Sequence, residues 1–65
     1  MTARLGWLTR QIRRARIAWL RAAAAGFERD ADDMEWRGCP TSARVARAEA
    51  ARMRRQADAL ADTLT

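Results

Sequence analysis

Few side chains in this 65-residue chain could carry out chemistry. The sequence has no histidine and no tyrosine, so it lacks the usual proton carriers near neutral pH. A helix over residues 28–35 would place Asp30, Asp32 and Asp33 on a solvated face, not in a glycine-bearing calcium loop. Cys39 has no second cysteine and no histidine beside it, which favours an incidental thiol. We therefore expect no catalytic, metal or cofactor site and no small-molecule substrate, and predict that the chain is not an enzyme.

The basic residues are the most distinctive charged groups of the chain. All 13 are arginine, and the formal net charge is +5. Residues 1–27 contain six of the arginines and no carboxylate, whereas residues 28–35 contain five carboxylates and a single arginine. Such a balance points to a nucleic acid, an anionic membrane or an acidic protein surface as partner. Arginine without lysine, beside so much alanine, is also typical of a GC-rich bacterial or phage genome.

Apolar residues recur at alternating steps of three and four in both halves of the chain, which is the spacing of packed helices. In the first half, this core row consists of Ile17, Leu20, Ala24, Phe27, Ala31 and Met34. In the second half, the matching row consists of Ala43, Ala46, Ala50, Met53, Ala57, Leu60 and Leu64. Alanine at so many of these positions lets two helices lie unusually close. The rows predict an all-α fold, an antiparallel two-helix hairpin.

The hairpin is expected to form one domain over residues 1–65. Its predicted parts are a first helix over about 2–36, a turn over 37–42 and a second helix over about 43–64. Gly38 is placed to end the first helix in a left-handed conformation, and Pro40 cannot continue it. Thr41 or Ser42 could cap the second helix. Gly26 is a weak point in the long helix, so a break into three helices is an open alternative.

Folding the two rows about the turn fixes a register. Its layers are Met34–Ala43, Ala31–Ala46, Phe27–Ala50, Ala24–Met53, Leu20–Ala57 and Ile17–Leu60. The predicted hairpin core accordingly contains Ile17, Leu20, Phe27, Met34, Ala50, Met53 and Leu60. The same register brings Glu28 and Glu35 to one edge of the hairpin. Arg47 and Arg54 lie on that edge, so we expect ion pairs between the helices there.

A second apolar row covers another side of the first helix. This N-terminal row consists of Leu5, Leu8, Ile12, Ala15 and Trp19. It is rotated by roughly 110° from the core row, so the helix has two apolar faces. One face holds the hairpin together, and the other must contact a second copy or a different molecule. Because a hairpin this small, without disulfide or metal, is marginal on its own, we expect a homodimer with a four-helix bundle.

Tryptophan and arginine are the residues most enriched at binding hot spots. Trp19 belongs to the N-terminal row and could fill a dimer core. Trp7 lies off both rows, where it is hard to bury within the chain, so we predict that it contacts a partner. The predicted partner or dimer interface consists of Leu5, Trp7, Leu8, Ile12, Arg16 and Trp19.

Three classes of partner fit these surfaces. The favoured one is another protein, bound by a helix face with anchors three and four residues apart. The alternative is nucleic acid, bound through Arg4, Arg10, Arg13, Arg14, Arg16 and Arg21, with no base-reading motif visible. An anionic membrane surface is the third, weakened because these arginines surround the helix. No stretch is long and apolar enough to span a membrane, and the lone cysteine suits a bacterial cytoplasm. The arginine-rich start is similar to an organellar presequence, but its helical pattern continues without a cleavage-type boundary, which favours a structural helix.

In layout, the chain resembles two kinds of known protein. Its length, alanine-rich rows and short turn are similar to Rop-like plasmid copy-number proteins, which are dimeric hairpins that bind a kissing RNA complex. Its brevity and its arginine-for-lysine usage resemble small helical-hairpin accessory proteins of temperate phages. Some of those dimerise and block host regulators, including quorum-sensing receptors. The resemblance implies a non-enzymatic protein of a phage or mobile element that binds and modulates a host protein, such as a transcriptional regulator.

Overall fold

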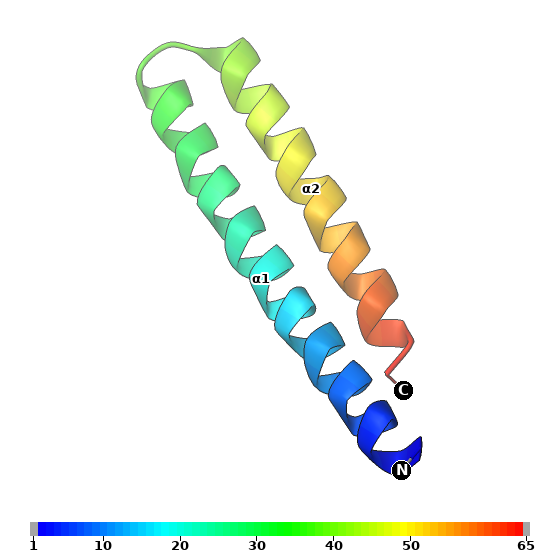
Figure 1. The fold of residues 1–65 in the computed structure, drawn as a ribbon. Coiled ribbons are helices and arrows are strands. Elements are labelled where there is room, and N and C mark those ends of the chain that lie inside the picture. Colours follow the sequence, from blue (N-terminus) through cyan, green and yellow to red (C-terminus); the bar gives the residue numbers. More distant parts are fainter. Residues whose placement is uncertain (1, 65) are drawn as a thin grey trace.

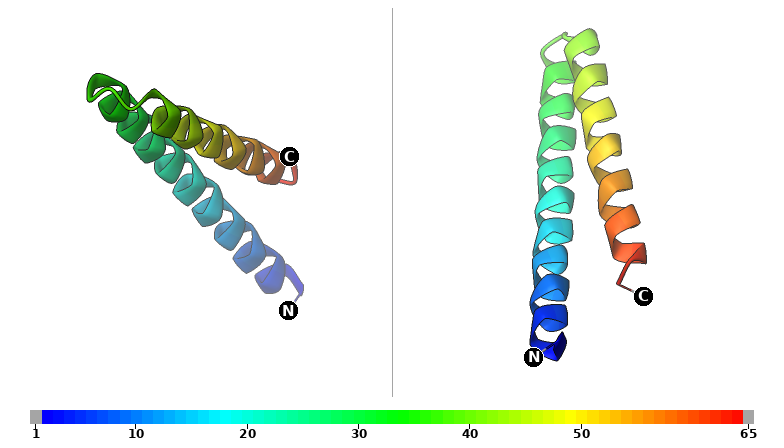
Figure 2. Two further views of the ribbon diagram at one scale, coloured as in Figure 1. Left: turned by 90° about the horizontal axis from the view of Figure 1, so that it is seen from above. Right: turned by 45° about the vertical axis from the view of Figure 1, so that its right-hand side comes forward.

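The structure is a hairpin of two antiparallel helices, seen in a computed structural model that describes residues 2–64. Helix α1 spans Thr2–Trp36 and helix α2 spans Pro40–Asp62. The molecule measures 56 × 14 × 12 Å along its principal axes, and its length is that of α1 (Figure 1). Because α2 is shorter, α1 continues past the C-terminal end of its partner helix, as all three views show (Figure 2). The predicted all-α hairpin is confirmed.

Helix α1 is continuous, so the three-helix alternative is wrong. Gly26 lies in the middle of the helix without interrupting it. A glycine costs a helix about 1 kcal/mol relative to alanine, which the packing of the flanking core row against α2 outweighs. A Cβ atom added at Gly26 would meet no heavy atom within 4 Å, so nothing in the chain itself requires glycine there.

The turn begins with a Schellman motif at the end of α1. Gly38 has a φ of 81°, the left-handed conformation predicted for it. The Cys39 amide donates to the Met34 carbonyl over 2.8 Å, and the Gly38 amide donates to the Glu35 carbonyl over 3.0 Å. These two bonds satisfy carbonyl groups that the end of a helix leaves free. The left-handed glycine then directs the chain back along α1.

Helix α2 begins earlier than predicted, at Pro40. The expected caps Thr41 and Ser42 lie inside its first turn, and Cys39 is the N-cap, with no side-chain cap hydrogen bond. Proline fits the first helical position because its fixed φ is helical and its missing N–H would have had no partner there. The prediction treated Pro40 only as a residue that ends a helix. The Ala43 amide donates to the Cys39 carbonyl over 3.1 Å and closes the first turn.

The core between the helices is narrow and built mostly of alanine. Eight described apolar residues are buried, and six of them are alanine. At the open end, Ile17, Leu20 and Ala57 form one buried cluster, with Met53, Leu60 and Leu64 packed against it. Near the turn, a second cluster contains Ala31, Ala43 and Ala46, with Phe27 and Met34 packed against it. Ala50 is buried as well. Both clusters join residues that the predicted register places side by side.

Candidate interaction surface

The N-terminal row holds four of the seven large apolar side chains that the described residues expose. Leu5 is 69% exposed, Leu8 51%, Ile12 62% and Trp19 60%. At about 100° per residue, these four side chains point into one sector of α1 only about 60° wide. Every residue from 4 to 16 is exposed. The row therefore forms a continuous apolar stripe that no described part of the chain covers.

Two features leave the row exposed: it lies on another side of α1 than the core row, and α2 ends before it reaches the first turns of α1. Residue Leu64, just after α2, packs against the cluster that contains Ile17. It also lines a small hollow together with Arg14, near the open end of the hairpin. The preceding residues of α1 extend past this point into solvent (Figure 1). We call residues 4–13 the overhang.

The overhang and the helical turn of α1 that follows it carry unpaired positive charge. None of Arg4, Arg10, Arg13, Arg14 and Arg16 forms an ion pair with a residue that the structure describes. The next arginine, Arg21, lies 3.4 Å from an Asp58 carboxylate oxygen in α2. Since residues 1–27 contain no carboxylate, no neighbouring side chain of α1 neutralises these five charges.

The two remaining tryptophans lie off both rows. Trp7 is 55% exposed in the overhang, and Trp36 is 89% exposed at the last position of α1. Their spacing places both on a third side of α1, away from the core row and the N-terminal row. The predicted interface set of Leu5, Trp7, Leu8, Ile12, Arg16 and Trp19 is thus exposed throughout but divided between two sides of the helix.

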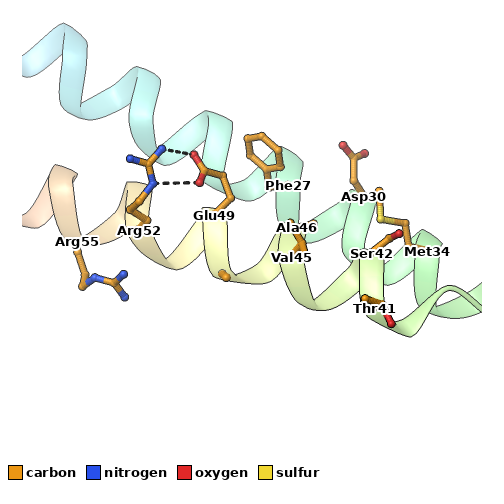
Figure 3. A pocket seen from close by; sticks show the side chains of 11 residues that line it. Phe27, Asp30, Met34, Thr41, Ser42, Val45, Ala46, Glu49, Arg52 and Arg55 are labelled. Atoms are coloured by element: carbon orange, nitrogen blue, oxygen red, sulfur yellow. Dashed lines mark hydrogen bonds and ion pairs between the residues drawn. The ribbon is translucent and has the colours of Figure 1, made fainter.

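A groove lies between the helices near the turn, with a volume of about 770 Å³ (Figure 3). Its lining is Phe27, Asp30, Met34, Thr41, Ser42, Val45, Ala46, Ala48, Glu49, Arg52 and Arg55. Phe27 and Met34 are only half-buried, although they were predicted as core, and Val45 is 67% exposed. These three side chains give the groove an apolar floor, and carboxylates of both helices lie at its rim (Figure 3).

The opposite flank of the hairpin is closed by ion pairs between the helices. Arg47 bonds to Glu35 and, over 2.9 Å, to Asp32. Arg54 bonds to Glu28, and the predicted pairs of this edge are confirmed. The hydrogen bond from Arg47 lowers the pKa of Glu35 below its ordinary value, and the same bond raises the pKa of Arg47.

The groove flank has no such bridge between helices among the described residues. The Glu49 carboxylate at the groove rim accepts a 3.0 Å hydrogen bond from Nε of Arg52, one turn further along the same helix. This bond lowers the pKa of Glu49. Asp30, on the other side of the groove, has no ion pair with a described residue. The two flanks therefore differ: one is tied across, and the other is open and apolar.

Sequence reasoning identified the N-terminal row and the ion-paired edge but missed the groove. Val45 carries the signal that could have found it, because it is an apolar residue of α2 outside the core row. The groove also depends on the partial burial of Phe27 and Met34, which spacing alone does not reveal.

The described residues show no arrangement for metal chemistry. No three of their histidine, cysteine, aspartate and glutamate side chains are grouped so that they could hold a metal ion. Cys39 is an exposed free thiol. No described helix is long and apolar enough to cross a membrane. What the arrangement offers is contact area: an apolar stripe, unpaired guanidinium groups and an open groove.

Comparisons with known proteins identify no relative of this chain, so its hairpin architecture is what remains to be interpreted. No family model, no curated protein and no solved structure matches this chain. The likeness to small dimeric hairpins is thus one of architecture, two helices packed antiparallel.

Proposed function

We propose that this chain is a non-enzymatic, homodimeric protein-binding module that acts through α1. In this proposal it is a small accessory protein of a phage or other mobile element, working in the cytoplasm of a bacterial host. It binds and modulates a host protein, such as a transcriptional regulator. No cofactor or small-molecule substrate takes part.

One observation supports this function above all others. The exposed half of α1 combines large apolar side chains with five unpaired arginines and contains no carboxylate. Apolar anchors three and four residues apart are what a helix needs to bind a protein surface, whether that of a second copy or that of a target. Trp7 and the arginines supply the residue types that dominate binding hot spots. The partner surface that complements them is acidic with an apolar centre.

Nucleic acid is the alternative partner, and the same arginines favour it. Arg4, Arg10 and Arg16 point to different sides of α1, so they could contact phosphates but do not form one stripe along a groove. Binding of that kind would tolerate any sequence and would weaken steeply with salt, because each neutralised phosphate releases counterions.

Capture from the native host, followed by mass spectrometry, tests the proposal. The bait is the full chain, and the decisive variant is Trp7→Ala. Trp36→Ala is the matched control, because it removes the same side chain from the same side of α1 at the acidic end. We expect one host protein that is lost with Trp7→Ala, retained with Trp36→Ala and bound again when purified.

A titration with duplex DNA and an RNA hairpin across a range of salt concentrations separates the two classes. Affinity for a protein target should change little with salt. If the affinity for either nucleic acid fell by several decades per decade of salt, and no host protein were captured, nucleic acid would be the partner in place of a protein.

A further inference from the structure

The open flank and the N-terminal row face the same side of the hairpin. At about 100° per residue, Phe27 and Met34 point to the edge of the core row nearest to the N-terminal row, and Asp30 points into the sector of the N-terminal row. The ion-paired residues Glu28, Asp32 and Glu35 point to the other side of the core row. A straight helix laid along the N-terminal row would therefore continue into the groove.

A second copy of α1 has the length and the shape to lie along the N-terminal row and the groove. Trp19 lies seventeen residues from each end of Thr2–Trp36, so two antiparallel copies crossing at Trp19 overlap along their whole length. This alignment pairs Ala15 with Ala23 and Ile12 with Gly26. It brings Leu8 beside Asp30, at the level of the groove.

We propose that two copies of this chain associate through this side, antiparallel, with the two-fold axis at Trp19. The overhang of each copy then lies in the groove between α1 and α2 of the other. This arrangement rests on the homodimer in the proposed function. It goes further by assigning the N-terminal row to the second copy and leaving Trp7, on another side of α1, for the target.

Charge favours this alignment over the other symmetric one. The overhang brings unpaired arginines toward a groove lined by two carboxylates, Asp30 and Glu49, and by two arginines, Arg52 and Arg55. An axis at Ile12 would also cover the row, by pairing Leu5 with Trp19. It would place the basic halves of both copies side by side, with no carboxylate of residues 1–27 between them. Like charges oppose association, so the axis at Trp19, which brings carboxylates near the overhang, is favoured over the axis at Ile12.

Gly26 gives an independent reason for the alignment. Nothing within the chain occupies the space around its Cα, yet this position in mid-helix carries the residue least favourable to a helix after proline. Gly26 points into the sector of the N-terminal row. Opposite Ile12 of the second copy, the missing side chain lets two helices approach closely.

The size of the hairpin core is consistent with this requirement for a second copy. Of its eight buried residues, only Ile17 and Leu20 are larger than alanine. Since apolar burial is the main favourable contribution to folding, a chain of this length needs further surface covered. The overhang in the groove would cover Leu8 and Ile12 of one copy together with Val45 of the other.

Cysteine crosslinking tests the alignment with small changes, in a Cys39→Ser background. Ala15→Cys and Ala23→Cys are made as separate chains, mixed and oxidised mildly. We expect a crosslinked dimer from the mixture and little from either chain alone. Ala18→Cys mixed with Ala23→Cys is the matched control and should not crosslink, because residue 18 points about 100° away from residue 19.

Two outcomes would overturn the proposal in distinguishable ways. Homotypic crosslinking of Ile12→Cys, with none in the Ala15 and Ala23 mixture, would place the axis at Ile12. Sedimentation as a monomer at all concentrations would remove the dimer altogether. Neither result affects capture of a host protein through Trp7, so the capture experiment tests the proposed target independently.

A glycine pair gives a second test that does not depend on oxidation. Gly26→Leu should weaken self-association by at least about tenfold, because the new side chain meets Ile12 of the second copy. Gly6→Leu is the matched control, since its Cβ also meets open space within the chain but points away from the row. Equal self-association of both variants with the unsubstituted chain, measured by sedimentation, would overturn the arrangement.

Discussion

The two parts of α1 share one uninterrupted helix but have opposite surroundings. Residues 4–16 are exposed at every position, basic and without a carboxylate. Residues 17–36 contain Ile17 and Leu20, which are 6% and 2% exposed, together with all the carboxylates of the helix. Both parts have the same helical backbone, so hydrogen bonding within the helix cannot account for their difference in exposure and charge.

The contrast shows which interactions hold each part in place. The second part is helical because its core row packs on α2, and four ion pairs close one flank across the helices. The first part has apolar residues at helical spacing but no described partner for them. Packing of an amphipathic face usually stabilises a helix more than propensity does. This is the reason for which we propose an intermolecular contact for the exposed row.

The largest expected effect contrasts Leu20→Ala with Leu8→Ala. Removing Leu20 from its cluster should lower the free energy of unfolding by about 2–5 kcal/mol at every protein concentration. Leu8→Ala should destabilise the fold only at concentrations where copies associate, because Leu8 touches no core cluster of its own chain. Denaturant unfolding followed by circular dichroism at several concentrations measures both. Equal, concentration-independent losses would show that the two parts of α1 do not differ in this way.

The second prediction concerns how closely the packed part approaches α2. Ala50 is 2% exposed in the core, so Ala50→Leu should force the helices apart and cost about 1–3 kcal/mol by overpacking. Ala59→Leu is the matched control, because this alanine of the same helix is exposed and its substitution should change stability by less than about 0.5 kcal/mol. Thermal melting measures both. An unchanged melting temperature in Ala50→Leu would exclude the close-packed core.

Spacing predicted the parts of the fold that depend on periodicity. The core rows, the register and the pairs of Arg47 and Arg54 all follow from steps of three and four along a helix. The start of α2 did not follow, because Pro40 can either end a helix or occupy its first position. The groove depends on how far Phe27 and Val45 project from a core made of alanine. That is set by the packing of both helices together.

The third prediction uses the three glycines of the chain to separate backbone from packing effects. Gly38→Ala should cost about 1 kcal/mol, because an L side chain is strained at a φ of 81°. Gly6→Ala should instead stabilise α1 by about 0.5–1 kcal/mol, since its backbone is helical and a Cβ there meets open space. Thermal unfolding measures whether each variant is less or more stable than the unsubstituted chain. No gain in stability from Gly6→Ala would mean that the overhang is not helical in solution.

The smallest effect tests where the acid sensitivity of the fold resides. The hydrogen bond from Arg47 holds the pKa of Glu35 below its ordinary value in the folded chain. A carboxylate whose pKa is lowered by folding stabilises the fold above its unfolded pKa, and this contribution disappears as the pH falls through the folded pKa. The unsubstituted chain should therefore lose stability between about pH 5 and pH 3. Glu35→Gln should lose less over that interval, and start from a lower stability at pH 7.

Asp30→Asn is the matched control for this pH profile. It removes a carboxylate from the same part of α1 that has no ion pair with a described residue, so the acid loss should persist in full. Urea unfolding at a series of pH values, at a concentration where the chain is monomeric, measures all three proteins. Because residues 4–16 contain no carboxylate, none of this acid dependence can arise there. If Glu35→Gln and the unsubstituted chain had parallel profiles, the ion-paired flank would not contribute to the stability of the packed part.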